Sequence, residues 1–144
     1  MTAKKCRDVM TENLVFATPG DPVSEVARLM KREDIGPVLI VDNKQSKTLV
    51  GIVTDRDLAI KVVGEGRDPQ TTKVDEVMTR KLVTCRADDA VDIAMKAMAQ
   101  NQLRRIPVVG ENTKLVGIIS QADVATRVDE PEKTAEVVRE ISQS

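Results

Sequence analysis

The sequence of 144 residues lacks histidine, tryptophan and tyrosine, and Phe16 is its only aromatic residue. Histidine is the usual general acid or base near neutral pH, so its absence argues against most acid–base enzymes. Two cysteines and the carboxylates are the remaining zinc ligands, which is a poor set. The shortage of aromatic rings also argues against a surface that stacks the bases of single-stranded nucleic acid.

Charge excess and long apolar runs are absent as well. The chain has 22 basic and 23 acidic residues, a formal net charge of −1. Without a basic excess we expect neither nucleic acid nor an anionic membrane surface as a partner. The apolar runs are only a few residues long, too short to cross a bilayer. The N-terminus, which begins Met-Thr-Ala-Lys-Lys, lacks the apolar core of a signal peptide, which predicts a cytoplasmic protein.

Cysteine is scarce, with only Cys6 and Cys85, and no Cys-x-x-Cys motif occurs. One pair is a poor disulfide framework. The favoured interpretation is two small buried hydrophobic residues in a reducing compartment. The alternative interpretation is a redox pair.

What the chain does contain is a repeat. Residues 49–59 return as residues 115–125, each time as an apolar run, a glycine, more apolar residues, a hydroxyl and, three positions later, a carboxylate. The polar pairs are Thr54 with Asp57 and Ser120 with Asp123. An internal repeat determines the architecture before any local argument does. The repeated polar pairs predict two related binding sites.

The repeat extends over most of the chain. Val9-Met10-Thr11 returns as Val77-Met78-Thr79, and the second copy is two residues shorter in a polar stretch around residues 42–47. Such length changes are typical of loops. We therefore divide the chain into a first motif with its lead-in at 1–66, an exposed linker at 67–72, a second motif at 73–128 and a C-terminal helical tail at 129–144.

Each copy has the pattern β-α-β-β-α. In the first copy the pattern predicts a short strand at 14–17, a helix capped by Asp21, a hairpin of strands 38–41 and 49–53, and a helix at 55–63. Asp89 is the corresponding cap in the second copy. A unit of this size buries little apolar surface alone. The sequence thus predicts an α/β (α+β) fold in which two pseudo-symmetric copies pack through their sheets, with two equivalent clefts between them.

The hydroxyl–carboxylate pairs have two interpretations. A threonine or serine at a helix start with an aspartate three residues later is a helix cap. A carboxylate can also accept two hydrogen bonds from a vicinal diol, as in dinucleotide-binding folds, and helix N-termini bind phosphate. The two roles do not exclude each other, and together they fit a nucleotide.

These segments resemble tandem CBS motifs, the pair called a Bateman module. The markers are the two Val-Met-Thr segments, Ile35-Gly36-Pro37-Val38, Arg104-Arg105-Ile106-Pro107-Val108, and the two Gly-Ile-x-Thr/Ser-x-x-Asp ends. The chain is also similar to small stand-alone prokaryotic CBS-pair proteins, including the hypoxic-response type. The resemblance covers residues from about 6 to 127.

The resemblance implies a non-catalytic regulatory module, not an enzyme. Such modules bind adenosyl ligands (AMP, ADP, ATP, S-adenosylmethionine or NAD) in clefts between the motifs and signal by conformational change. No cofactor is required, because the adenine nucleotide is the regulatory ligand. A homodimer is expected, together with a regulated protein that the sequence does not identify. The alternative is a structural or dimerisation module with empty or degenerate clefts.

The resemblance also assigns site residues. It implies that Asp57 and Asp123 bind ribose hydroxyls. The phosphate-binding candidates are Thr54, Ser120, Arg56, Arg104 and Arg105. Because no aromatic residue is nearby in sequence, adenine would have to lie in an apolar slot, formed by Ile35, Gly36, Pro37, Val38, Leu103, Ile106 and Pro107.

The two copies differ at these positions. Arginine suits phosphate through charge-assisted, forked hydrogen bonds, but Arg104 and Arg105 replace Gly36 and Pro37 of the first copy. A solvated pair of arginines at a turn is the alternative interpretation. We expect two unequal sites.

Overall fold

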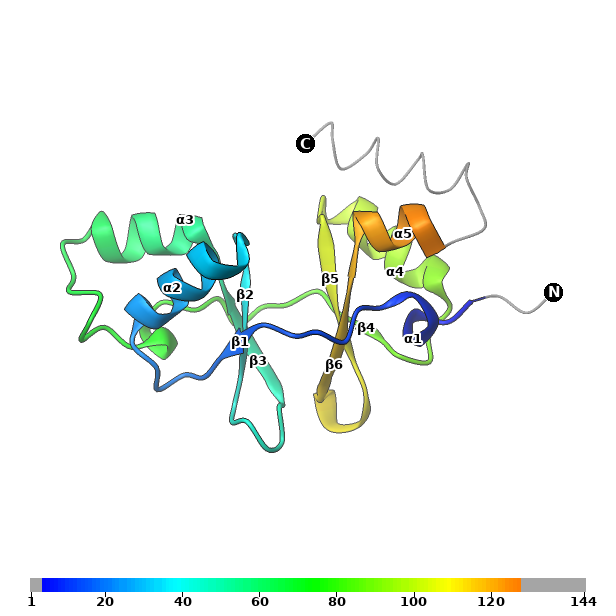
Figure 1. The fold of residues 1–144 in the computed structure, drawn as a ribbon, viewed down its shortest axis with the longest axis horizontal. Helices are drawn as coiled ribbons and strands as arrows, with labels where there is room; N and C mark the ends of the chain where they lie inside the picture. Colours follow the sequence, from blue (N-terminus) through cyan, green and yellow to red (C-terminus); the bar gives the residue numbers. More distant parts are fainter. Residues whose placement is uncertain (1–3, 128–144) are drawn as a thin grey trace. The chain divides into compact units, whose positions relative to one another are not determined.

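The computed structural model describes residues 4–127, which form two compact units (Figure 1). The first unit consists of residues 15–82, and the second unit consists of residues 4–14 together with residues 83–127. The helical tail predicted at 129–144 lies outside the described residues. Within residues 4–127, no helix has the length and apolar character needed to cross a membrane.

The first unit is a three-stranded sheet with helices on one face (Figure 1). Its strands, β1 (Phe16–Ala17), β2 (Val38–Val41) and β3 (Leu49–Val53), lie in the order β1-β2-β3. β1 is parallel to β2, and β2 forms an antiparallel hairpin with β3. Its helices are α2 (Val23–Glu33), α3 (Asp55–Asp57), the π-helix η1 (Leu58–Val63) and the 3-10 helix η2 (Val74–Glu76).

The second unit repeats this topology. Its sheet contains β4 (Cys85–Arg86), β5 (Arg105–Val109) and β6 (Leu115–Ser120) in the order β4-β5-β6. The helices are α1 (Cys6–Val9), α4 (Val91–Gln100), the 3-10 helix η3 (Glu111–Thr113) and α5 (Gln121–Arg127). The mixed α/β class and the β-α-β-β-α pattern of both copies are therefore confirmed.

Each unit has its own apolar core. In the first unit the fully buried side chains include Val26 of α2, Ile40 of β2 and Val53 of β3. In the second unit they include Met98 of α4 and Ile119 of β6. The alternation of buried and partly exposed residues along β3 and β6 places the helices and the core on one face of each sheet.

The lead-in segments are exchanged between the two copies. Thr11 precedes the first motif, but its backbone pairs with Ile118 of β6 through two hydrogen bonds of 2.8 and 3.0 Å. Thr79 precedes the second motif and pairs with Ile52 of β3 through two bonds of 2.9 Å. The compact units therefore differ from the divisions at 1–66 and 73–128, because each lead-in adds a backbone bridge to the last strand of the other copy.

The exchange explains the glycine that both copies keep in the last strand. A Cβ atom at Gly51 would lie 2.8 Å from the Sδ atom of Met78 and 3.1 Å from the carbonyl oxygen of Thr79. At Gly117 it would overlap the side chain of Met10. Each glycine thus leaves the space that the methionine of the exchanged lead-in fills.

The predicted cap of α2 by Asp21 is wrong. The Asp21 carboxylate accepts from the backbone N–H of the preceding turn at residue 18, at 2.9 Å. The first N–H groups of α2 instead donate to carbonyl oxygens of the segment predicted as an exposed linker: Val23 to Thr72 at 2.9 Å and Ser24 to Pro69 at 3.0 Å. Backbone acceptors distant in sequence therefore do what a side-chain cap usually does.

The same correction applies to α4. Asp89 accepts from the backbone N–H of Arg86 at 2.9 Å, while Val91 at the helix start donates to the carbonyl oxygen of Lys4 at 2.9 Å. The capping acceptor comes from the exchanged lead-in. Residues before Cys6 thus help to begin a helix of the second copy.

Candidate functional site

The first polar pair lies where β3 ends and α3 begins. The backbone N–H of Thr54 donates to the Asp57 carboxylate at 2.9 Å, and the N–H of Asp57 donates to the Thr54 hydroxyl at 3.1 Å. This reciprocal pair is a capping box, so the capping interpretation is confirmed for this copy. The Asp57 carboxylate keeps a second oxygen for another partner.

That oxygen faces a residue that the sequence analysis missed. The ammonium group of Lys61 lies 3.2 Å from Oδ1 of Asp57 and donates to the carbonyl oxygen of Val77 at 2.9 Å. The Asp57 side chain is 14% exposed and that of Lys61 is 40% exposed. The i,i+4 spacing of the two charges was the available signal. Lys61 thus links the candidate ribose acceptor to the lead-in of the second motif.

The segment before β2, residues 35–37, contacts the start of α3 beside Asp57. The backbone N–H of Asp55 donates to the carbonyl oxygen of Gly36 at 3.2 Å, and a Cβ atom on Gly36 would lie 3.5 Å from the Asp55 carboxylate. Ile35, Gly36 and Pro37 are half-buried. The side chain of Val38 is fully buried in the core, so it cannot line an open slot for adenine.

The second polar pair has more hydrogen bonds. The backbone N–H and the hydroxyl of Ser120 donate to Oδ2 of Asp123 at 2.9 and 3.0 Å, and the N–H of Asp123 donates to the Ser120 hydroxyl at 3.2 Å. The hydroxyl of Thr11 donates to the same carboxylate at 3.2 Å. Asp123 is only 8% exposed.

Thr11 is the second residue that the sequence analysis missed as part of a site. It served there only as a marker of the repeat. Its hydroxyl reaches Asp123 because the exchanged lead-in pairs with β6, and only the tertiary structure shows that exchange.

Arg104 and Arg105 lie at the same end of the second sheet. The backbone N–H of Gln121 donates to the carbonyl oxygen of Arg104 at 3.1 Å, and Arg105 is paired across the sheet with Ser120. Both arginines are exposed. The structure therefore brings two basic residues to the junction that carries Ser120 and Asp123.

The apolar residues predicted to line the adenine slot of the second copy are in part half-buried and in part fully buried, like those of the first copy. Leu103 is half-buried, whereas Ile106 and Pro107 are buried. The side chain of Ile106 belongs to the core, as that of Val38 does, so it does not line an open slot. Leu103 and the backbone around it remain the candidates there.

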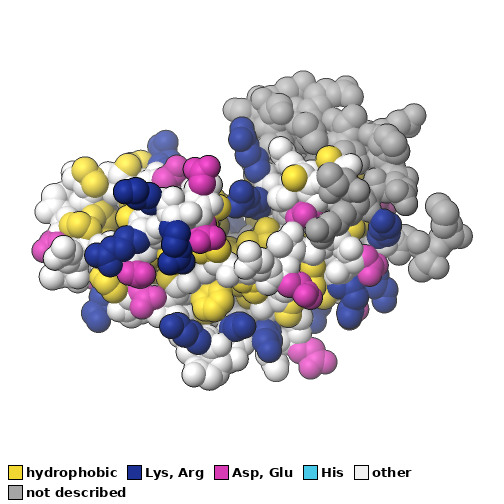
Figure 2. Space-filling model, viewed as in Figure 1, with side chains coloured by type: hydrophobic (Ala, Val, Ile, Leu, Met, Phe, Trp, Pro, Cys, Tyr) yellow, Lys and Arg dark blue, Asp and Glu magenta, His cyan; other side chains and the backbone are white. Residues whose placement is uncertain are grey.

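Arg56, the basic candidate of the first copy, is exposed on α3. On the face shown in Figure 2, basic and acidic side chains are interspersed over the helices of the first unit. This mixture agrees with the near-zero net charge of the chain. Arg56 therefore adds positive charge to a mixed surface.

Metal-ligating residues do not gather in the part of the chain that the structure describes. There, no group of three or more histidine, cysteine, aspartate or glutamate side chains is placed to hold a metal ion. The chemistry of the polar pairs is that of hydrogen-bond acceptors beside basic residues.

The comparison with family models identifies this arrangement. The model described as "CBS domain" matches twice, at residues 6–64 and 74–130. The chain belongs to the CBS domain family. Both matches begin at a lead-in and end just after a Gly-Ile-x-Thr/Ser-x-x-Asp segment, so the repeat is a tandem pair of CBS domains.

Two relatives match over most of their length. The Bacillus subtilis protein YlbB is 38% identical over 139 residues, 96% of this chain and 92% of that protein. Hypoxic response protein 1 of Mycobacterium tuberculosis is 31% identical over 124 residues, 86% of this chain and 85% of that protein. The chain is thus similar to small stand-alone CBS-pair proteins.

Solved structures show the same fold. The crystal structure of Hypoxic Response Protein I with two coordinated zinc ions is 30% identical, with a TM-score of 0.76, and covers 87% of this chain and 99% of that one. The CBS domain pair of MJ0100, in complex with 5'-methylthioadenosine and S-adenosyl-L-methionine, is 26% identical with a TM-score of 0.70. The match covers 86% of this chain and 94% of that chain. A CBS pair similar to this chain therefore binds adenosyl compounds.

Proposed function

We propose that this CBS pair is a non-catalytic regulatory module that binds adenine nucleotides at its two strand–helix junctions. The observation that carries the proposal is the repeated polar pair, Thr54 with Asp57 and Ser120 with Asp123, each beside the backbone that precedes the central strand. A carboxylate held in this way is an acceptor for two vicinal hydroxyl groups, which matches a ribose. The adenosyl ligands of the MJ0100 pair support the same class of ligand.

The two junctions offer different partners to the phosphate groups. In the first unit the basic neighbours are Arg56 and Lys61, and Lys61 already contacts Asp57. In the second unit two exposed arginines, Arg104 and Arg105, flank the junction. Because arginine binds phosphate through paired hydrogen bonds, we expect nucleotides with more phosphate groups to prefer the second junction.

One observation favours a second candidate function. Both carboxylates are already bound by protein donors as helix caps. A structural module, in which the repeated pairs only begin two helices, would look the same at these atoms. The two functions differ in what the carboxylates bind in solution, which a titration measures.

The decisive experiment is titration calorimetry with AMP, ATP and S-adenosylmethionine on the wild type, Asp57→Asn and Asp123→Asn. Asparagine keeps the size and one acceptor oxygen but removes the charge. We expect each variant to lose binding at one junction while the other junction keeps its affinity. An absence of heat with all three ligands would favour the structural module.

An exposed carboxylate provides the matched control. Asp75 lies in η2, is exposed and belongs to neither polar pair, so Asp75→Asn removes the same charge from a residue outside both pairs. Its ligand affinities should equal those of the wild type. The thermal unfolding of each variant, measured beside the titration, separates lost binding from lost folding.

We further propose that the chain forms a homodimer through η1. Ile60 and Val63 are 51% and 77% exposed on this one turn of helix. Large apolar side chains that are exposed on one short helix indicate a protein partner, and a second copy supplies the same helix by symmetry. Light scattering should show the mass of a dimer for the wild type and of a monomer for Ile60→Lys with Val63→Lys. A monomeric wild type would contradict the proposal.

A further inference from the structure

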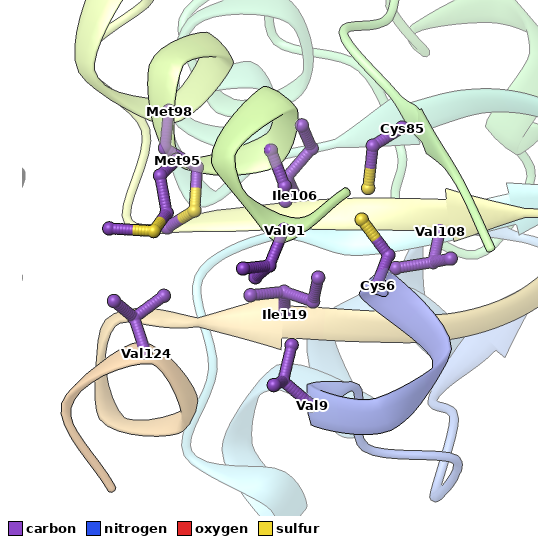
Figure 3. Close-up of a cluster of buried hydrophobic side chains, with 11 residues drawn as sticks. Cys6, Val9, Cys85, Val91, Met95, Met98, Ile106, Val108, Ile119 and Val124 are labelled. Carbon is purple, nitrogen blue, oxygen red and sulfur yellow. The ribbon is translucent and has the colours of Figure 1, made fainter. Parts of the chain in front are cut away.

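The two cysteines of the chain meet in the core of the second unit. Cys6 is in α1 and Cys85 is in β4, 79 positions later. Figure 3 shows the two sulfur atoms pointing toward each other among the apolar side chains of this core. The chain has no other cysteine, so any intramolecular disulfide must join these two.

Backbone hydrogen bonds hold the two cysteines together. The N–H of Cys6 donates to the carbonyl oxygen of Asp89 at 2.9 Å, and the N–H of Arg7 donates to that of Ala87 at 3.0 Å. Cys85 is held from the other side, because β4 pairs with β5 at Val108. The proximity of the sulfur atoms is therefore built into the main chain.

The surroundings give the two thiols different acidities. Cys6 and Cys85 are 0% and 2% exposed. As thiols, Cys6 and Cys85 donate to the carbonyl oxygens of Ala90 and Pro107, at 3.9 and 3.8 Å. A hydrogen bond that Cys85 donates to the ionised Cys6 lowers the pKa of Cys6, and this interaction together with burial raises the pKa of Cys85. Cys6 is therefore the thiol that ionises first. Its reaction with a dissolved oxidant requires α1, a helix of four residues at the edge of the unit, to open.

We propose that Cys6 and Cys85 are a redox modification site that forms a reversible intramolecular disulfide. The oxidant that we assign by class is a hydroperoxide. The Cys6 thiolate attacks one oxygen of the peroxide, so that an S–O bond forms and the O–O bond breaks. This gives a sulfenic acid and, from hydrogen peroxide, a hydroxide ion that is protonated to water. The Cys85 thiol then attacks the sulfenic sulfur, the S–S bond forms and a second water leaves. In sum, two thiols lose two protons and two electrons, and one hydrogen peroxide becomes two waters.

The disulfide would add a covalent bond between the exchanged lead-in and the second unit. Hydrogen bonds and packing hold the exchanged lead-in on the second unit, through Cys6, Arg7 and Thr11. A Cys6–Cys85 bond closes a loop that contains the whole first unit. Oxidation should therefore slow the opening of the lead-in and restrict the unfolded chain.

The test uses the full chain, reduced under nitrogen and then treated with hydrogen peroxide. We expect both thiols to become unreactive to iodoacetamide in denaturant, with the loss of two hydrogens in mass and no covalent dimer. Dithiothreitol should restore both thiols while its own dithiol becomes a cyclic disulfide. The oxidised form should unfold at a higher temperature, and its backbone amides at residues 6–11 should exchange hydrogen more slowly.

Two results would overturn the proposal: both thiols remain alkylatable after peroxide, or the products are sulfinic acids and intermolecular dimers only. Peptide mapping of the oxidised wild type, without reduction, must yield a linked pair of peptides that contain Cys6 and Cys85. This measurement needs no variant. As controls, Cys6→Ser and Cys85→Ser each keep one thiol, and neither should gain thermal stability from peroxide.

Discussion

At the scale of residues, the two candidate carboxylates have the same covalent context but different partners. Asp57 lies beside the ammonium group of Lys61, whereas Asp123 accepts from the hydroxyl of Thr11. Both aspartates follow a hydroxyl residue by three positions, so the sequence predicts them equally. The added partners come from the helix that follows in one unit and from the exchanged lead-in in the other. The chemistry of a site is therefore set by residues outside its motif.

Lys61→Met tests the charge at the first junction. The change removes the cation beside Asp57 and keeps most of the apolar stem. Because the ion pair is partly exposed, we expect the free energy of unfolding to fall by about 1 kcal/mol or less. The uncompensated carboxylate should weaken ATP binding at this junction by several-fold and leave adenosine binding nearly unchanged. Calorimetry with ATP and with adenosine gives the change in affinity for each ligand, and the two changes are then compared.

Lys44→Met is the matched control for this prediction. Lys44 is an exposed residue of the loop between β2 and β3, so its loss changes the net charge equally. If both variants weakened ATP binding equally, net charge, and not contact with Asp57, would set the affinity for ATP.

At the scale of elements, the last strand of each copy carries a glycine because a methionine of the exchanged lead-in packs on it. In the first unit this pair is Gly51 of β3 and Met78, which is 8% exposed. The interpretation of the glycine as part of a repeated strand was correct, but the strand alone gives no reason for it. The reason lies in the neighbour that the fold brings from 27 positions away.

Gly51→Ala should therefore be destabilising. The added methyl group would meet the sulfur of Met78 and the backbone of Thr79, and crowding of this kind typically costs 1–3 kcal/mol. Denaturant unfolding would measure the change. Gly20→Ala is the control, because a Cβ atom at exposed Gly20 meets no atom within 4 Å. If Gly51→Ala lowered the free energy of unfolding no more than Gly20→Ala does, the result would contradict the packing argument.

At the scale of the whole molecule, the order of the motifs in sequence differs from the composition of the compact units. Residues 15–82 form one unit without a break, whereas the second unit needs both 4–14 and 83–127. The division at residues 1–66 separates the first motif from its backbone partners at Pro69, Thr72 and Thr79. It also retains a lead-in whose partner strand, β6, is missing.

Two fragments of similar length test this composition. We expect residues 15–82 to be more stable than residues 1–66, because only the former contains η2 and the bridge from Thr79 to Ile52. Circular dichroism during heating should show a cooperative transition at higher temperature for 15–82. A more stable 1–66 fragment would mean that the sequential motif is the folding unit.

The sequence by itself determined the duplication, the β-α-β-β-α pattern and the two hydroxyl–carboxylate pairs. These features depend on the local spacing of apolar and polar residues, which is visible along one chain. The tertiary structure alone decided where the lead-ins pair, which acceptors begin α2 and α4, and which apolar residues of the expected slot are buried in the cores. Val38 and Ile106 look like lining residues in sequence and are core residues in the fold. Contacts of this kind join residues far apart in the chain, and no local pattern encodes their partners.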